Sequence, residues 1–152
     1  MLFVSGTGKS LIIKAITSSI QDKLGSNAFV LLASTGIAAL NIGGQTVHSY
    51  FSTPRDKKNF NDLVGEQARN FTNKISAVKF VLIDEYSTIG CSLLGMIEKR
   101  CSQGKEWNTE PFGGLNFFLF GDIDQLPPVK DLPVYHPKPQ TPLAQHGKLV
   151  FG

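Results

Sequence analysis

Residues 5–10 have the sequence Ser-Gly-Thr-Gly-Lys-Ser, a short loop between an apolar run and a helix-like pattern. Two further stretches follow in order, VLIDE at 81–85 and GDIDQLPP at 121–128, each where an apolar run of strand length ends. Glycines allow backbone N–H groups to turn toward phosphates, and the helix that follows directs its positive end at them. The three motifs in this order predict a protein that uses a nucleoside triphosphate, which we expect to be ATP.

Apolar segments of strand length alternate with segments of helical periodicity along most of the chain. Continuous apolar runs of this length suit strands that are buried on both faces of a parallel sheet. The alternation predicts an α/β fold with a mainly parallel sheet and right-handed crossovers, in which ligands bind at the carboxyl ends of the strands. The expected strands are residues 2–4, 28–33, 78–83 and 116–120.

The expected helices are separated by polar or proline-rich segments. In the first helix, Ile12, Ile16 and Ile20 recur every four residues on one face. No role is assigned to His136 or His146, which we expect in an irregular tail. The remaining expectations are a helix stop at Gly25, a loop at 34–40 that opens a short helix, a surface excursion at 52–73, a helix at 89–101, a connection at 102–114 and irregular structure at 127–142.

Length and composition limit the class of protein. With 152 residues, the chain has room for one ordinary core, so a single domain over residues 1–152 is expected. Its 41% hydrophobic and 18% charged residues are typical of a globular protein, and a net charge of +3 permits a polyanionic partner without requiring one. No apolar run approaches the roughly 20 residues of a membrane span, so we expect a soluble, intracellular protein with no membrane partner. Cys91 and Cys101 lack the spacing of a zinc site and are expected to be reduced thiols.

The loop at 5–10 allows two interpretations. In the first, Lys9 reaches the β and γ oxygens of the nucleotide and the hydroxyl of Ser10 holds Mg²⁺. In the second, the glycines form a turn that caps a helix, and Lys9 lies in solvent. Taken alone, the loop fits both equally. The full pattern has a glycine five residues before Gly8, where this chain has Phe3, so either the loop is short or the chain begins inside its first strand.

Two acids and one amide follow the later strands. Asp84 is suited to hold the Mg²⁺ complex through water, and Glu85 to polarise the attacking water. Gln125 is suited to sense the γ-phosphate, because a neutral amide does not compete for the metal. The alternatives are a strand that ends in two solvated acids and a turn followed by a rigid Pro-Pro exit. The preceding phosphate loop favours the catalytic interpretation of the acids.

Two other segments offer contacts to a nucleic acid. Hydroxyls and loop N–H groups at Ser34 and Thr35 are able to bind phosphates, and His48, Tyr50 or Phe51 to stack on bases. From these residues alone, we prefer a simpler interpretation, in which the serine and threonine belong to an ordinary loop and the aromatic side chains to the core.

Five segments resemble the ordered motifs of the Pif family, the petite-integration-frequency helicases of superfamily 1B, which are related to the helicases of rolling-circle transposons. They are GTGKS at 6–10, ASTGIAA at 33–39, TVHS at 46–49, IDE at 83–85, and GD at 121–122 with QLPPV at 125–129. The resemblance covers nearly the whole chain. It implies a three-layer, RecA-like fold of the phosphate-loop NTPase class, here with a truncated first strand, and the ATP-dependent motor lobe of a 5′-to-3′ DNA helicase.

The resemblance also implies roles for particular residues. ATP would be bound by Gly6, Thr7, Gly8, Lys9, Ser10 and Leu11, Mg²⁺ by Ser10 and Asp84, and single-stranded DNA by Ser34, Thr35 and His48, with Lys9, Glu85 and Gln125 as the catalytic set. The implied partner is single-stranded or forked DNA. The implied cellular roles are telomere maintenance, DNA repair and recombination, in the nucleus or mitochondrion of a eukaryote.

The chain departs from the family pattern in three ways. The family's phosphate loop is longer at its start, its upstream glutamine motif for adenine has no match here, and its second RecA-like lobe has no counterpart. Because unwinding depends on ATP closing a cleft between two lobes, we expect a fragment without autonomous unwinding. The alternatives are a non-catalytic relic that binds nucleotide or DNA, and a small-molecule kinase, which would not explain the threonine-glycine and histidine motifs.

Overall fold

The computed structural model describes residues 2–3, 8–121, 127–135, 138 and 141–151. Within these residues the sheet has five strands in the order β1-β5-β4-β2-β3, and every neighbouring pair is parallel. The strands are β1 (Leu2–Phe3), β2 (Phe29–Ala33), β3 (Gln45–Thr46), β4 (Phe80–Asp84) and β5 (Asn116–Phe120). Four of them lie within two residues of the expected strands, and the short edge strand β3 was not expected.

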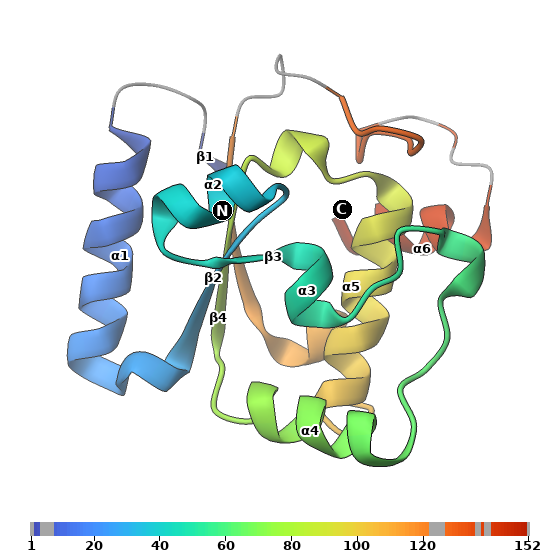
Figure 1. Cartoon of the computed structure of the whole chain (residues 1–152), viewed down its shortest axis with the longest axis horizontal. Helices are drawn as coiled ribbons and strands as arrows, with labels where there is room; N and C mark the ends of the chain where they lie inside the picture. The colour runs from blue at the N-terminus through green and yellow to red at the C-terminus, as the bar shows by residue number, and fades with distance from the viewer. Residues whose placement is uncertain (1, 4–7, 122–126, 136–137, 139–140, 152) are drawn as a thin grey trace.

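Helices cover both faces of this sheet. Figure 1 shows α1 on one face and α3, α5 and α6 on the other. The helices are α1 (Lys9–Leu24), α2 (Gly36–Ile42), α3 (Val47–Phe51), α4 (Gly65–Ile75), α5 (Cys91–Gly104) and α6 (Pro142–Phe151). In the described part of the chain, none of them combines the length and apolarity that crossing a bilayer requires.

The side chains of β4 alternate between the two faces, so each layer of helices has its own core. Val81 and Ile83 are buried in the larger cluster, which includes residues of α5, whereas Leu82 is buried with Ile13 and Ile20 of α1. A strand buried on both faces is the arrangement that the continuous apolar run predicts. The expected three-layer α/β fold with a parallel sheet is therefore confirmed.

The buried face of α1 contains Ile13 in place of the expected Ile12. Ile13 and Ile20 are 3% and 8% exposed, whereas Ile12 is 40% exposed. Isoleucines at 12, 13, 16 and 20 support two overlapping stripes, and the angle at which α1 meets the sheet decides between them. Gly25 ends the helix as predicted, with a φ of 90° that suits glycine.

Two helices lie where irregular structure or a surface excursion was expected. α4 occupies the end of the polar segment and buries Phe71 and Ile75, which lie close to Gly104 of α5. α6 begins at Pro142, a favourable first residue for a helix, and packs on α5. His146 therefore lies in a helix rather than an irregular tail, and its Nε2 contacts the carboxylate of Glu98 on α5. His136 lies outside the described residues.

The helix α5 is buried along most of its length by its neighbours. A Cβ atom at Gly147 of α6 would lie 1.8 Å from the carbonyl oxygen of Cys91, so the two helices meet backbone to backbone. Cys91 and Cys101 are both buried free thiols. Burial raises the pKa of the Cys101 thiol well above its ordinary value, which keeps this thiol protonated and unreactive.

A buried arginine on α5 holds the polar segment that follows α3. Arg100 is 2% exposed, and its Nε donates to the Phe51 carbonyl at 2.9 Å. Its Nη1 and Nη2 each donate at 3.2 Å, to the carbonyls of Asn61 and Ser52 respectively. The guanidinium also lies 4.7 Å from the centre of the Phe60 ring. One side chain thus fixes both ends of the segment from 51 to 61.

Candidate nucleotide and DNA site

The register of the sheet brings the strand ends to one level. Ala33 pairs with Asp84, and Asp84 pairs with Phe120. On the outer strands, Phe3 pairs with Phe120 and Thr46 with Ala33. The segments that follow these residues therefore leave the sheet along a single carboxyl edge, where the sequence predicted the ligands to bind.

Lys9 and Asp84 meet at this edge. The Nζ atom of Lys9 lies 2.7 Å from Oδ1 of Asp84, and their side chains are 20% and 10% exposed. Lys9 is the first residue of α1 and Asp84 the last residue of β4, so two motifs 75 positions apart in sequence form one ion pair. The interpretation in which Lys9 lies free in solvent is wrong.

The amino end of α1 is open to an anion. Gly8 precedes the helix with a φ of 138°, and within the described residues no side chain caps the helix and its first turn carries no acid. The first backbone N–H groups of a helix carry a partial positive charge, which such an arrangement leaves available. Ser10 is exposed in this first turn, and Leu11 is 72% exposed. Gly6, Thr7 and Gln125 lie outside the described residues.

Glu85 has a strained backbone beside Asp84. Its φ and ψ of 55° and 45° lie in the left-handed region, which costs a non-glycine residue about 1–3 kcal/mol. Two hydrogen bonds hold it there: its N–H donates to Oδ1 of Asp84 at 2.9 Å, and Oγ1 of Thr88 donates to its carbonyl at 2.9 Å. Strain of this kind is concentrated at functional sites, where it fixes the direction of a side chain.

The three predicted DNA contacts lie together. Ser34, Thr35 and His48 line one cavity of about 310 Å³, with Arg55 and Lys57 from the segment after α3. Sequence reasoning missed both of these cations. Tyr50 and Phe51, in contrast, are 3% and 0% exposed, which confirms the prediction that the aromatic side chains belong to the core.

Each predicted contact has a distinct local environment. The Oγ atom of Ser34 is buried and has no hydrogen-bond partner in the described part of the chain. Oγ1 of Thr35 accepts from the N–H of Ala38 and so caps α2, which leaves its own hydroxyl proton to donate. Nδ1 of His48 lies 3.0 Å from Oγ1 of Thr53, which leaves Nε2 for a ligand.

One side of the same cavity is fixed by an acid that the sequence did not indicate. Asp131 accepts hydrogen bonds from the N–H groups of Ser92 and Leu93 at 3.3 and 3.1 Å, so it caps α5 from 38 residues away. Its Oδ1 also lies 3.0 Å from Nζ of Lys57. Burial by itself would raise the pKa of Asp131, but the bonds from Lys57 and the backbone N–H groups outweigh it and hold the pKa below its ordinary value.

Replacing Asp131 with asparagine is expected to lower the free energy of unfolding by about 1–2 kcal/mol at pH 7, because the amide keeps the shape but loses the charge. The folded-state pKa is depressed, so the carboxylate stabilises the fold above its unfolded pKa of about 3.9 and loses this effect as the pH falls through the folded value. Urea unfolding at pH 7 and at about pH 3 measures this, with Asp22→Asn on the exposed side of α1 as control. If the free energies of unfolding of the wild type and Asp131→Asn differ by the same amount at both pH values, this prediction is contradicted.

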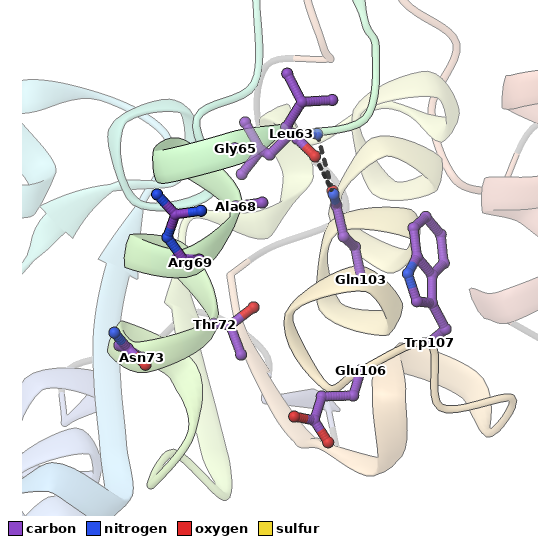
Figure 2. A pocket seen from close by; sticks show the side chains of 10 residues that line it. Leu63, Gly65, Ala68, Arg69, Thr72, Asn73, Gln103, Glu106 and Trp107 are labelled. Atoms are coloured by element: carbon purple, nitrogen blue, oxygen red, sulfur yellow. Dashed lines mark hydrogen bonds between the residues drawn. The ribbon is translucent and has the colours of Figure 1, made fainter.

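A larger cavity lies away from this edge. Figure 2 shows it between α4 and the end of α5, lined by residues that include Arg69 and Trp107, and its volume is about 640 Å³. The Gln103 side chain closes one side. Its Oε1 accepts from the N–H of Leu63 at 3.1 Å, and its Nε2 donates to the carbonyl of the same residue at 2.6 Å. No predicted site residue lines this cavity.

Comparison with known proteins gives one consistent family. The chain is 34% identical over 128 residues to the ATP-dependent DNA helicase RRM3 of Saccharomyces cerevisiae, and 36% identical over 128 residues to the ATP-dependent DNA helicase PIF1 of Candida albicans. Each alignment covers 82% of this chain but only 17% and 14% of the relative, so the chain spans less than a fifth of these proteins.

Solved structures agree with the sequence relatives. Bacteroides Pif1 bound to single-stranded DNA superposes with a TM-score of 0.69 at 29% identity, over 86% of this chain and 30% of that one. Pif1 from Bacteroides in complex with ADP-AlF4 gives a TM-score of 0.69 at 32% identity, over 85% and 30% of the two chains. A model of the PIF1-like helicase family matches residues 1–142. The chain therefore belongs to the PIF1-like helicase family.

Proposed function

We propose that residues 1–152 form a single RecA-like motor lobe that binds and hydrolyses ATP and couples hydrolysis to 5′-to-3′ unwinding of DNA. The observation that carries the proposal is the Lys9–Asp84 ion pair, which lies at the same sheet edge as the cavity of Ser34, Thr35 and His48. A nucleotide site and a DNA site on one edge of a rigid sheet suit a motor, because a structural change on binding one ligand can alter the contacts to the other.

The residues at this edge fit a nucleoside triphosphate with Mg²⁺. Lys9 supplies a cation for the β and γ oxygens, and the uncapped amino end of α1 supplies backbone N–H groups. Ser10 and Asp84 offer the oxygen ligands that Mg²⁺ prefers, directly or through water. When bound, the metal would neutralise negative charge on the phosphates.

The hydrolytic step would depend on the acid next to Asp84. Glu85 is the residue suited to accept a proton from water as that water attacks the γ-phosphate. Its strained backbone and the bonds to Asp84 and Thr88 orient it without help from substrate, which lowers the cost of positioning during the reaction. Gln125 is proposed as the sensor of the γ-phosphate, on the sequence motif alone.

Single-stranded DNA would be bound through its backbone. The free hydroxyl proton of Thr35 is a donor suited to a phosphate, and Nε2 of His48 is a second polar group. Ser34 is proposed as a third contact, for which its buried Oγ, without a partner among the described residues, would have to turn toward the strand. Contacts of this kind position a strand without reading its sequence. We propose single-stranded or forked DNA as the partner; the related Bacteroides Pif1 has been solved with single-stranded DNA.

We propose that a second RecA-like lobe, outside these residues, supplies the arginine that completes the site. The loss of such an arginine costs about 10³- to 10⁵-fold in rate, so this chain alone should bind ATP and hydrolyse it slowly. Near-normal turnover by the isolated chain would contradict this part of the proposal. By its resemblance to Pif-family helicases, the longer protein would act in telomere maintenance, DNA repair and recombination, in the nucleus or mitochondrion.

Replacing Lys9 with alanine tests the proposal directly. We expect ATP affinity in the presence of Mg²⁺ to fall by about 10- to 100-fold, the equivalent of one or two charge-assisted hydrogen bonds. Calorimetric titration of the purified chain measures this, and Lys14→Ala, an exposed lysine of the same helix, should bind like the wild type. If the folded wild-type chain binds neither ATP nor single-stranded DNA, the proposed function is wrong.

A single-turnover assay of ATP hydrolysis separates the proposal from its closest alternative. A non-catalytic relic would bind ATP or DNA but leave ATP uncleaved even when protein is in excess and the reaction is followed for many hours. Slow hydrolysis that Lys9→Ala removes would exclude the relic.

A further inference from the structure

The cavity that Ser34, Thr35 and His48 line also has a cationic wall. Arg55 and Lys57 lie on this wall, in the segment that Arg100 anchors to α5. Both are brought to the sheet edge by the fold of the segment after α3, because they belong to none of the strands that carry the motifs.

The two cations differ in how their charge is balanced. Lys57 forms an ion pair with Asp131 and donates to the carbonyl of Lys130, so its charge is already used inside the protein. Arg55 is exposed, and among the described residues no carboxylate lies within ion-pair distance of it. Arg55 is therefore the cation of this wall that is available to an anion.

The rest of the lining suits a sugar–phosphate chain. The lining combines the polar residues Ser34, Thr35 and His48 with apolar surface from Leu93, Met96 and Val129. Val129 is 86% exposed, so the rim on that side is apolar and open to solvent. No Phe, Tyr or Trp side chain lines the cavity in the described part of the chain, so apart from the half-buried ring of His48 the lining favours contacts to the backbone over stacking on bases.

We propose that Arg55 binds a backbone phosphate of single-stranded DNA and extends the DNA site from Ser34, Thr35 and His48 across the cavity. The inference rests on the proposed function, since it assumes that this edge binds a single strand. Asp131 acts indirectly, by holding Lys57 and with it the segment that presents Arg55. Because Arg55 meets a phosphate, its contribution is the same for every base sequence.

Salt dependence of binding by the full chain tests this inference. Arg55→Ala is expected to weaken binding of a short oligothymidylate by about three- to tenfold, and to reduce the slope of log affinity against log salt by about 0.7, the value for one phosphate of a single strand. Fluorescence anisotropy between about 50 and 200 mM salt measures both quantities. Arg69→Ala is the matched control, because it removes the same charge at an exposed site in the other cavity.

A second measurement distinguishes a direct contact between Arg55 and a phosphate from a long-range electrostatic attraction to the whole strand. Oligothymidylates with one uncharged methylphosphonate linkage are compared, one position at a time, on the wild type and on Arg55→Ala. One linkage is expected to weaken binding to the wild type and to leave binding to the variant unchanged, because the two losses report the same contact.

The outcomes separate the inference from the function beneath it. If the wild type binds the oligonucleotide but Arg55→Ala matches Arg69→Ala in affinity and slope, the role of Arg55 is wrong and the proposed DNA site stands. If every linkage affects wild type and variant alike, Arg55 makes no direct contact and the inference also fails. If the folded wild type binds no oligonucleotide, both the inference and the DNA-binding part of the proposed function are overturned.

Discussion

Replacing Glu85 with glutamine is expected to lower the rate of ATP hydrolysis by about 10²- to 10⁴-fold while ATP affinity stays within about twofold of the wild type. Glutamine keeps the length of the side chain and tolerates the same backbone, whose φ is 55°. It loses the ability to accept a proton from water, which matters only in the transition state. The variant should therefore separate catalysis from binding, whereas Lys9→Ala is expected to weaken binding itself.

Single-turnover hydrolysis with protein in excess measures the Glu85 effect, because the isolated chain is expected to be slow. Glu66→Gln is a suitable control, since it makes the same change of charge at an exposed position of α4. If Glu85→Gln hydrolyses ATP at the wild-type rate, Glu85 is not the base, and another group must activate the water.

Replacing Arg100 with alanine is expected to lower the free energy of unfolding by about 3–5 kcal/mol, a large part of the 5–15 kcal/mol typical of a folded domain. Three backbone carbonyls, of Phe51, Ser52 and Asn61, would lose their donor inside the protein. Burial lowers the pKa of Arg100, and the nearby charge of Asp62 only partly offsets this, so holding the guanidinium there already has a cost. The hydrogen bonds of the guanidinium must offset this cost of burial.

Urea unfolding of Arg100→Ala beside Lys99→Ala provides the comparison, because Lys99 is the exposed neighbour on the same helix. Arg100→Lys should lie between the wild type and alanine, since one ammonium cannot donate in the three directions that the planar guanidinium serves. A loss below about 1 kcal/mol for Arg100→Ala would show that water replaces the guanidinium at little cost. Because residues 51–61 also carry Thr53 and Arg55, binding of single-stranded DNA should fall with stability.

The position of Asp84 and Glu85 at the carboxyl edge of the sheet was predictable, because both lie at the end of a strand. An apolar run followed by Asp84 and Glu85 indicates both a strand and the chemistry at its end. Parallel pairing then brings such ends together without any further information. The register that aligns Ala33, Asp84 and Phe120 confirmed that reasoning.

The other side of the site was less predictable, because its contacts join segments far apart in the chain. Asp131 caps a helix 38 residues away, and no local spacing encodes such a bond. Arg55 is one of several scattered cations, and only the fold brings it to the cavity. Helix α4 was missed because Phe71 and Ile75 are the only residues that it buries, too few for a clear helical pattern in a polar segment.

The Lys9–Asp84 ion pair would couple the binding of a nucleotide to the binding of a divalent cation. Without ligand, each charge neutralises the other at 2.7 Å, so the edge tolerates a poorly hydrated carboxylate. At the proposed site, a nucleotide that drew Lys9 away would leave Asp84 beside its phosphates, and a divalent cation bound to Asp84 would release Lys9. Each ligand would therefore prepare the site for the other, and thermodynamic reciprocity requires that the two affinities then rise by the same factor. At the proposed site, the pair would thus favour the metal–nucleotide complex over either component alone.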